Sequence, residues 1–150
     1  MFKIKNILLP TDFSEGFIHT LNYAVEIARA MESELHIIHV IEPFVFQSDV
    51  VMTKYGFDEL QNELEIYAKK DIEKIVKTLK EKEVKFSTKV LRGKAYEEIL
   101  DYAKKNHIDM ICIAIHGSSN LENLLFGSTT EKVLRKANCP VLTVRIKDSE

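Results

Sequence analysis

Two hydrophobic patterns alternate along the chain, one of short apolar runs and one of apolar residues at helical spacing. The short runs predict five β-strands, over residues 3–10, 34–41, 84–91, 108–115 and 140–146. A strand buried on both faces is apolar throughout, whereas a half-exposed strand alternates apolar and polar residues. The runs around Ile7 and Ile111 are continuous, so we expect central strands there. The run around Phe86 alternates and predicts an edge strand.

The segments between these runs place apolar residues three and four positions apart, which predicts four helices. Their expected bounds are residues 14–31, 57–82, 94–106 and 128–137, and Ser14 is available to cap the first helix. Strands that alternate with helices form parallel sheets with right-handed crossovers and helices on both faces. We therefore expect an α/β fold in a single domain over residues 1–150. We expect a doubly wound, five-stranded parallel sheet with the strand order 3-2-1-4-5 and helices on both faces.

The connection over residues 42–56 is too long for a simple turn and contains apolar residues such as Phe44 and Phe46. Loops of this length in compact domains tend to be functional or mobile. Its apolar residues must cover part of the core, a ligand or a second subunit, and the sequence leaves these alternatives open.

Composition narrows the class of protein. The 150 residues are 45% hydrophobic and carry 21 Lys+Arg against 23 Asp+Glu, a net charge of -2. Nucleic-acid-binding domains usually have a clear basic excess, so no nucleic-acid partner is expected. No apolar run approaches the roughly 18 residues of a membrane span, and the first residues lack the features of a signal peptide. We expect a cytoplasmic protein with no membrane partner, in which Cys112 and Cys139 are structural thiols.

The predicted topology also places a candidate binding site. Ligands of open parallel sheets bind beyond the carboxyl ends of the strands, where the strand order reverses. If the first and fourth strands are central and adjacent, two segments face each other at that point: Pro10-Thr11-Asp12 and Ala114-Ile115-His116-Gly117. We expect these segments to line a common crevice.

The second segment continues into a loop bounded by glycines. Nine residues separate Gly117 from Gly127, and Ser128 and Thr129 follow at once and open the last helix. Glycine lets backbone N–H groups face anionic oxygens, and a helix start adds unpaired N–H groups and the positive end of the dipole. We expect a phosphate chain here, with Asp12 accepting hydrogen bonds from ribose hydroxyls.

The backbone edge near Val40, at the end of the second strand, suits an adenine ring. The loop is neither a Walker A motif, because no lysine follows Gly127 in GST, nor a GxGxxG fingerprint. Simpler roles remain open for two of the residues. Asp12 can be a turn residue, and Ser128 can be only a helix cap.

The histidines predict neither catalysis nor metal binding. His116 has no orienting partner in the sequence, as a general base would need. His36 and His39 are three positions apart on a strand and therefore lie on its opposite faces. We predict no catalytic residue and no metal site formed by side chains.

At this point the sequence resembles the universal stress protein family over essentially its whole length. The similar segments are KNILLPTDFSE, HIIHVIEP, LRGKAYEEIL, HIDMICIAIHG and LLFGSTTEKVLRKANCPVLTVR. The family's nucleotide motif is Gly-x2-Gly-x9-Gly-Ser/Thr. Its second and third glycines match Gly117 and Gly127, and its hydroxyl residue matches Ser128. Ala114 stands in place of the first glycine, which is a departure from the motif.

The resemblance implies a stress-response protein that binds ATP, with Mg²⁺ or Mn²⁺ carried by the phosphates. It places Asp12 at the ribose and Val40 at the adenine. It also implies a homodimer through the final strand, Val141–Ile146, and an apolar edge strand would be an aggregation hazard if left unpaired. Three hypotheses follow: a nucleotide-dependent switch, a slow ATP hydrolase on the same site, or an interaction module in which Ala114 marks a lost nucleotide site.

Overall fold

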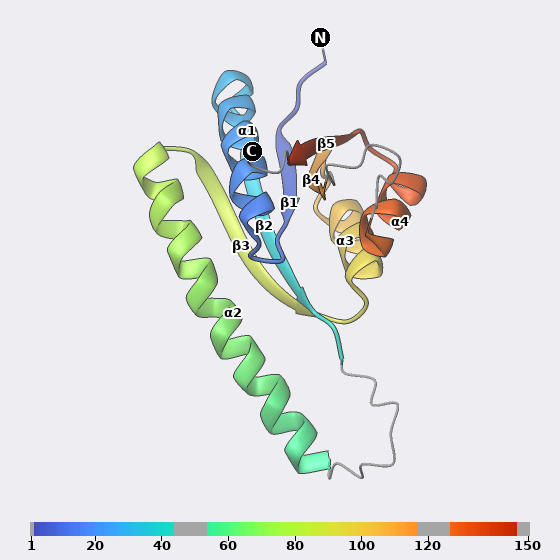
Figure 1. Ribbon diagram of the computed structural model, residues 1–150. Coiled ribbons are helices and arrows are strands. Elements are labelled where there is room, and N and C mark those ends of the chain that lie inside the picture. The colour runs from blue at the N-terminus through green and yellow to red at the C-terminus, as the bar shows by residue number, and fades with distance from the viewer. Residues whose placement is uncertain (1, 44–53, 117–126, 147–150) are drawn as a thin grey trace.

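The computed structural model describes residues 2–43, 54–116 and 127–146 (Figure 1). Strands and helices alternate along these ranges, as the hydrophobic pattern predicts. Their bounds are β1 Asn6–Pro10, α1 Glu15–Met31, β2 Glu34–Ile41, α2 Lys54–Lys82, β3 Lys85–Arg92, α3 Ala95–Lys105, β4 Met110–His116, α4 Ser128–Lys136 and β5 Val141–Ile146. Within these ranges, no helix combines the length and apolar composition that a membrane crossing requires.

The five strands form one sheet in the order β3-β2-β1-β4-β5, and every neighbouring pair is parallel. The predicted order is confirmed. β1 and β4 are central, β3 is an edge strand as its alternating pattern predicts, and β5 forms the other edge. β1 lies beside β2 on one side and β4 on the other, with Ile7 opposite both Leu35 and Met110.

Helices cover both faces of the sheet, α1 and α2 on one and α3 and α4 on the other (Figure 1). The side chains of β1 alternate between the two cores that result. Ile7 and Leu9 pack with α1 and α2, whereas Leu8 packs with Ile99 of α3 and Val133 of α4. All three β1 residues are fully buried, which explains why this strand is apolar without interruption.

Two element boundaries differ from the prediction by three residues. β1 begins at Asn6 rather than Lys3, because its pairing with β2 begins at Asn6 and Glu34. The Asp109 carboxylate instead accepts hydrogen bonds from the backbone N–H groups of Lys5 and Asn6, at 2.8 and 2.9 Å. α2 begins at Lys54, so part of the predicted 42–56 connection is helical. Residues 44–53, including Phe44 and Phe46, lie outside the described residues.

Ser14 occupies the N-cap position of α1, as expected, but its side chain makes no capping hydrogen bond. Ser14 is thus the N-cap residue by position, without a hydrogen bond from its hydroxyl. The Ser14 backbone N–H instead donates to the Asp12 carboxylate at 3.0 Å. The carboxylate two residues earlier thus organises the entry to α1.

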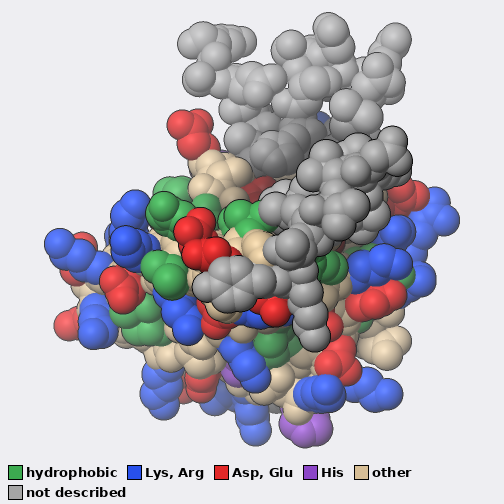
Figure 2. Space-filling model, turned by 90° about the horizontal axis from the view of Figure 1, so that it is seen from below, with side chains coloured by type: hydrophobic (Ala, Val, Ile, Leu, Met, Phe, Trp, Pro, Cys, Tyr) green, Lys and Arg blue, Asp and Glu red, His purple; other side chains and the backbone are tan. Residues whose placement is uncertain are grey.

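β1, β2 and β3 run downward in Figure 1, and Figure 2 shows the molecule from below, the side to which these strands point. On this face, Lys and Arg side chains are interspersed with Asp and Glu side chains. That mixture agrees with the net charge of -2. Any attraction for an anion here must therefore come from local groups rather than from a basic surface.

Candidate functional site

A cavity of about 350 Å³ opens at the carboxyl ends of the central strands. Its walls come from β1 and the loop after it, from β2 and β4, from α1, and from the first turns of α3 and α4. Eight residues of the predicted site line it: Pro10, Thr11, Asp12, Val40, Ala114, Gly127, Ser128 and Thr129. The ninth, Gly117, lies outside the described residues. The structure thus brings together side chains that are more than a hundred residues apart in the chain.

The loop after β1 is held by a series of hydrogen bonds. The Thr11 backbone N–H donates to the Ile38 carbonyl at 2.8 Å, which extends the β1–β2 ladder to the cavity. The buried Thr11 hydroxyl then accepts the Phe13 N–H at 2.9 Å, and the Asp12 carboxylate accepts the Ser14 N–H at 3.0 Å. Asp12 therefore has the turn role that the sequence left open, and it also lines the cavity.

The opposite wall is the start of α4. Gly127 is its N-cap residue, and neither Gly127 nor any described side chain caps the first turn. The first N–H groups of a helix have no partner within it, so Ser128, Thr129 and Thr130 bring backbone donors to the cavity. These donors coincide with the positive end of the α4 dipole. This wall is suited to an anion without any lysine or arginine.

Gly127 is not required by the packing of the described residues. A Cβ built on it meets no heavy atom within 4 Å, and its φ of -53° is accessible to any residue. A larger side chain at this position would instead occupy open space beside the cavity. The glycine keeps that space free.

Ala114 lies on the other side of the sheet from α4. Strand alternation places it on the same face as Met110 and Cys112, which pack in the core beneath α1, whereas Ile111 packs in the core with α3 and α4. Its methyl group is therefore directed toward the α1 side of the cavity. The departure from the glycine motif does not project a methyl group at the α4 donors.

The wall formed by α3 was not predicted from the sequence. Ala95 and Ile99 line the cavity from the first turns of this helix. The residue at the α3 N-cap position, Lys94, provides no side-chain cap. The Glu42 carboxylate, at the end of β2, accepts the Ala95 N–H at 2.9 Å instead. No local motif signals this contact, because it joins residues 53 positions apart.

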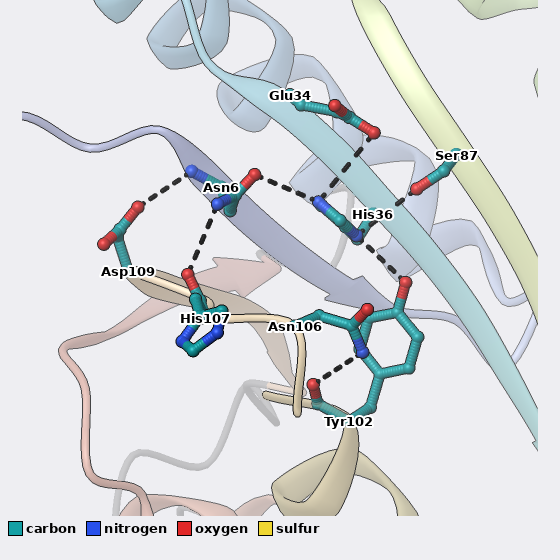
Figure 3. Close-up of polar contacts among 8 residues, drawn as sticks. All are labelled: Asn6, Glu34, His36, Ser87, Tyr102, Asn106, His107 and Asp109. Carbon is teal, nitrogen blue, oxygen red and sulfur yellow. Dashed lines mark hydrogen bonds and ion pairs between the residues drawn. The ribbon is translucent and has the colours of Figure 1, made fainter. Parts of the chain in front are cut away.

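A second polar cluster lies at the opposite end of the sheet, around His36 (Figure 3). Its Nδ1 is 2.9 Å from the Tyr102 hydroxyl, and its Nε2 is 3.3 Å from Asn6 Oδ1 and 3.9 Å from a Glu34 oxygen. The Asn6 amide nitrogen donates to the His107 carbonyl, so Asn6 Oδ1 is the acceptor and His36 Nε2 carries the hydrogen. Burial lowers the pKa of His36, and Glu34 partly opposes this effect.

His36 and His39 lie on opposite faces of β2, as predicted. His36 contacts Tyr102 of α3, whereas His39 packs against Phe13 at the start of α1. Within the described ranges, no group of three or more His, Cys, Asp or Glu side chains is arranged to hold a metal ion. Burial raises the pKa of Cys112 to about 12, so this thiol is unreactive at neutral pH.

Comparison with known proteins agrees with the fold. The family model described as "Universal stress protein family" matches residues 3–145. The chain belongs to the universal stress protein family. It is 34% identical over 157 residues to universal stress protein MJ0577 of Methanocaldococcus jannaschii, an alignment that covers 97% of each chain. It is 33% identical to MJ0531 of the same organism over 142 residues, covering 94% of this chain and 82% of the relative.

Solved universal stress protein structures share the architecture. The structure of MJ0577 superposes with a TM-score of 0.83, covering 99% of this chain and all of the other. Two more distant structures share the fold. One, in complex with cAMP, has a TM-score of 0.68 at 18% identity and covers 96% and 98% of the two chains. The other, from Archaeoglobus fulgidus in complex with dAMP, has a TM-score of 0.65 at 19% identity and covers 95% and 98%.

Proposed function

We propose that this universal stress protein binds ATP in the cavity at the carboxyl ends of β1, β2 and β4, and that the bound nucleotide biases its conformation. One observation carries the proposal. Residues that the sequence predicts for the phosphates, the ribose and the adenine line one continuous cavity, although they come from four separate segments of the chain. Convergence of this kind at a strand-order reversal is typical of nucleotide sites in doubly wound sheets.

Each wall of the cavity suits one part of the ligand. The backbone donors of Ser128 and Thr129 suit the phosphates, and the open space at Gly127 lets phosphate oxygens approach them. The Asp12 carboxylate suits hydroxyl donors of the ribose. Val40 and Ile38 form an apolar wall for the adenine ring. A divalent cation, Mg²⁺ or Mn²⁺, would be carried by the phosphates rather than by a cluster of side chains.

Relatives support the ligand class. Universal stress proteins of the same fold have been solved with cAMP and with dAMP, both of which are adenine nucleotides. We propose ATP as the ligand because this chain retains Gly127 and Ser128, the motif residues that are expected to contact the phosphates. Since the described cavity contains no lysine, we expect micromolar rather than nanomolar affinity, or about -8 kcal/mol.

The decisive experiment has two stages. The purified protein is first denatured, and the supernatant is analysed for adenine nucleotide. The nucleotide-free protein is then melted with and without ATP and Mg²⁺, and we expect a higher Tm with ATP, because a ligand of the native state raises stability. Neither released nucleotide nor a shift at millimolar ATP would contradict the proposal and favour the interaction module, for which Ala114 is the motivating residue.

Substitutions at Gly127 locate the site. We expect Gly127→Ala to weaken ATP binding and Gly127→Val to abolish it, both with unfolding midpoints close to that of the wild type, since a Cβ here meets no described atom. A Gly127→Val protein that binds ATP normally would exclude this wall as the phosphate site. Magnesium-dependent phosphate release that is lost in Gly127→Val would instead favour the slow hydrolase.

We further propose that the protein is a cytoplasmic homodimer joined through β5. This strand is at an edge of the sheet, and its described side chains are mostly half-buried in the single chain. An edge strand of this kind exposes a row of backbone groups that can pair with a second copy.

A further inference from the structure

The loop that carries Asp12 has an unusual backbone conformation. Phe13, immediately after Asp12, has a φ of 62°, in the left-handed region that residues other than glycine rarely adopt. Such conformations persist only where the surrounding structure imposes them. The contacts of the two residues that flank Asp12 therefore decide how Asp12 is presented to the cavity.

One side chain from a different strand contacts both flanking residues. His39 of β2 places its Nδ1 2.7 Å from the Thr11 carbonyl oxygen, on one side of Asp12. Its ring packs against the ring of Phe13, on the other side, with centroids 4.4 Å apart and planes inclined by 38°. His39 is half-buried and lines the same cavity. His39 thus links the loop that carries Asp12 to β2 through one side-chain hydrogen bond and one ring contact.

The hydrogen bond also assigns the tautomer of His39. A carbonyl oxygen only accepts, so Nδ1 must donate and must carry a hydrogen. The neutral ring is then protonated on Nδ1 and not on Nε2. This assignment is independent of any ligand.

We propose that His39 is a positioning residue for the nucleotide, and that it holds Asp12 in the orientation that recognises the ribose hydroxyls. This inference rests on the proposed function. A loop that is fixed before the ligand arrives loses less conformational freedom on binding. His39 supplies that preorganisation from the rigid sheet, whereas the phosphate wall at Ser128 lies on α4 and does not depend on it.

If His39 positions Asp12, removing its side chain should lower the affinity for nucleotides that have ribose hydroxyls and for no others. In His39→Ala, the affinity for ATP should fall to about the affinity that the wild type has for 2′,3′-dideoxy-ATP, which lacks both ribose hydroxyls. The affinity for 2′,3′-dideoxy-ATP itself should not change. We expect the wild type to prefer ATP over the dideoxy analogue by roughly tenfold or more, as hydrogen bonds to a charged group would give. If His39 had only a structural role, His39→Ala would lower the affinity for both nucleotides to the same extent.

Calorimetric titration with the two nucleotides and Mg²⁺ tests this for a matched set of variants. His39→Asn places an amide nitrogen near the Nδ1 position and should retain the preference for ATP, whereas His39→Gln extends the amide beyond it and should lose the preference. Asp12→Ala should lose it equally, and the double variant His39→Ala/Asp12→Ala should lose nothing further. His19→Ala, which removes an exposed histidine from α1, is the control and should behave as the wild type.

The outcomes separate the two proposals. A wild-type protein that binds no ATP overturns the proposed function, and this inference with it. A wild type that prefers ATP, with a His39→Ala variant that keeps the preference or weakens both nucleotides equally, overturns the inference alone. If His39→Ala does not fold, the comparison of His39→Asn with His39→Gln gives the same decision. Ring ¹⁵N chemical shifts of His39 that indicate the Nε2–H tautomer would also overturn it.

Discussion

Ala114 and Gly127 occupy two of the glycine positions of the family's nucleotide motif, and their surroundings differ. Gly127 faces open space at the start of α4, so the space beside this wall of the cavity depends on it. Ala114 is in the middle of a strand pair, opposite Val144, and alternation directs its methyl group toward α1. The same substitution, glycine to alanine, therefore has different consequences at the two positions.

We expect Ala114→Gly to change the Kd for ATP by less than tenfold, a difference of about 1.4 kcal/mol. It should also lower the free energy of unfolding by about 0.5–1 kcal/mol, because glycine is unfavourable within a strand. Titration calorimetry and urea unfolding measure the two effects. A much larger gain in ATP affinity would mean that the methyl group does obstruct the nucleotide.

His36 makes stability depend on pH. Burial lowers its pKa in the folded state below the ordinary value of 6.5. Above pH 6.5 both the folded and the unfolded protein hold it neutral. As the pH falls below 6.5, the unfolded chain takes up the proton first, and the free energy of unfolding decreases until the folded-state pKa is reached.

Urea unfolding at pH 7.5 and pH 5.5 tests this for the wild type and for His36→Gln, which cannot titrate at that position. We expect the wild type to lose more stability between the two pH values than the variant does. Equal losses would assign the acid sensitivity of the protein to other groups.

At the scale of elements, α3 depends on a residue outside itself. Its N-cap position is occupied by Lys94, whose side chain does not cap, and the cap comes from Glu42 at the end of β2. A carboxylate at this end of a helix also interacts favourably with the dipole. Because Ala95 and Ile99 line the cavity, this contact sets one of its walls.

Glu42→Ala should therefore destabilise the protein by about 1 kcal/mol, the usual effect of losing a helix cap. Glu42→Gln keeps an oxygen acceptor and should lose less. Urea unfolding of the two variants at pH 7 measures the difference. Equal losses would mean that the charge, and not the hydrogen bond, accounts for the contribution of Glu42.

At the scale of the whole molecule, the sequence predicts the fold better than it predicts the walls of the site. The continuous runs at Ile7 and Ile111 identify the central strands because burial on both faces excludes polar residues, and the structure confirms this. The Asp12 and Ser128 segments are recognisable because turn and helix-start chemistry is local. His39 was missed as a site residue because Thr11 and Phe13 become its neighbours only when β2 pairs with β1. Glu42 was missed because Ala95 follows β3 and reaches it only when β2 pairs with β3.

The oligomeric state tests the other whole-molecule proposal. We expect a dimer in sedimentation velocity at micromolar concentration, and we expect Thr143→Lys on β5 to dissociate it, because lysine on an edge strand opposes pairing. Thr88→Lys places the same change on the opposite edge, β3, and should leave the dimer intact. A monomeric wild type, or equal dissociation by both variants, would contradict pairing through β5.

The central position of β1 has a consequence for how the protein is made. The β2 partner of β1 leaves the ribosome soon after it, but the other neighbour of β1 is β4, and Asn6 and Asp109 are separated by 103 residues. At about 5–20 residues per second, the open edge of β1 waits for seconds before β4 is available. During that interval Ile7 and Leu8 present an apolar, unpaired strand. The nascent chain, rather than the finished protein, is therefore the form most exposed to aggregation and most in need of a chaperone.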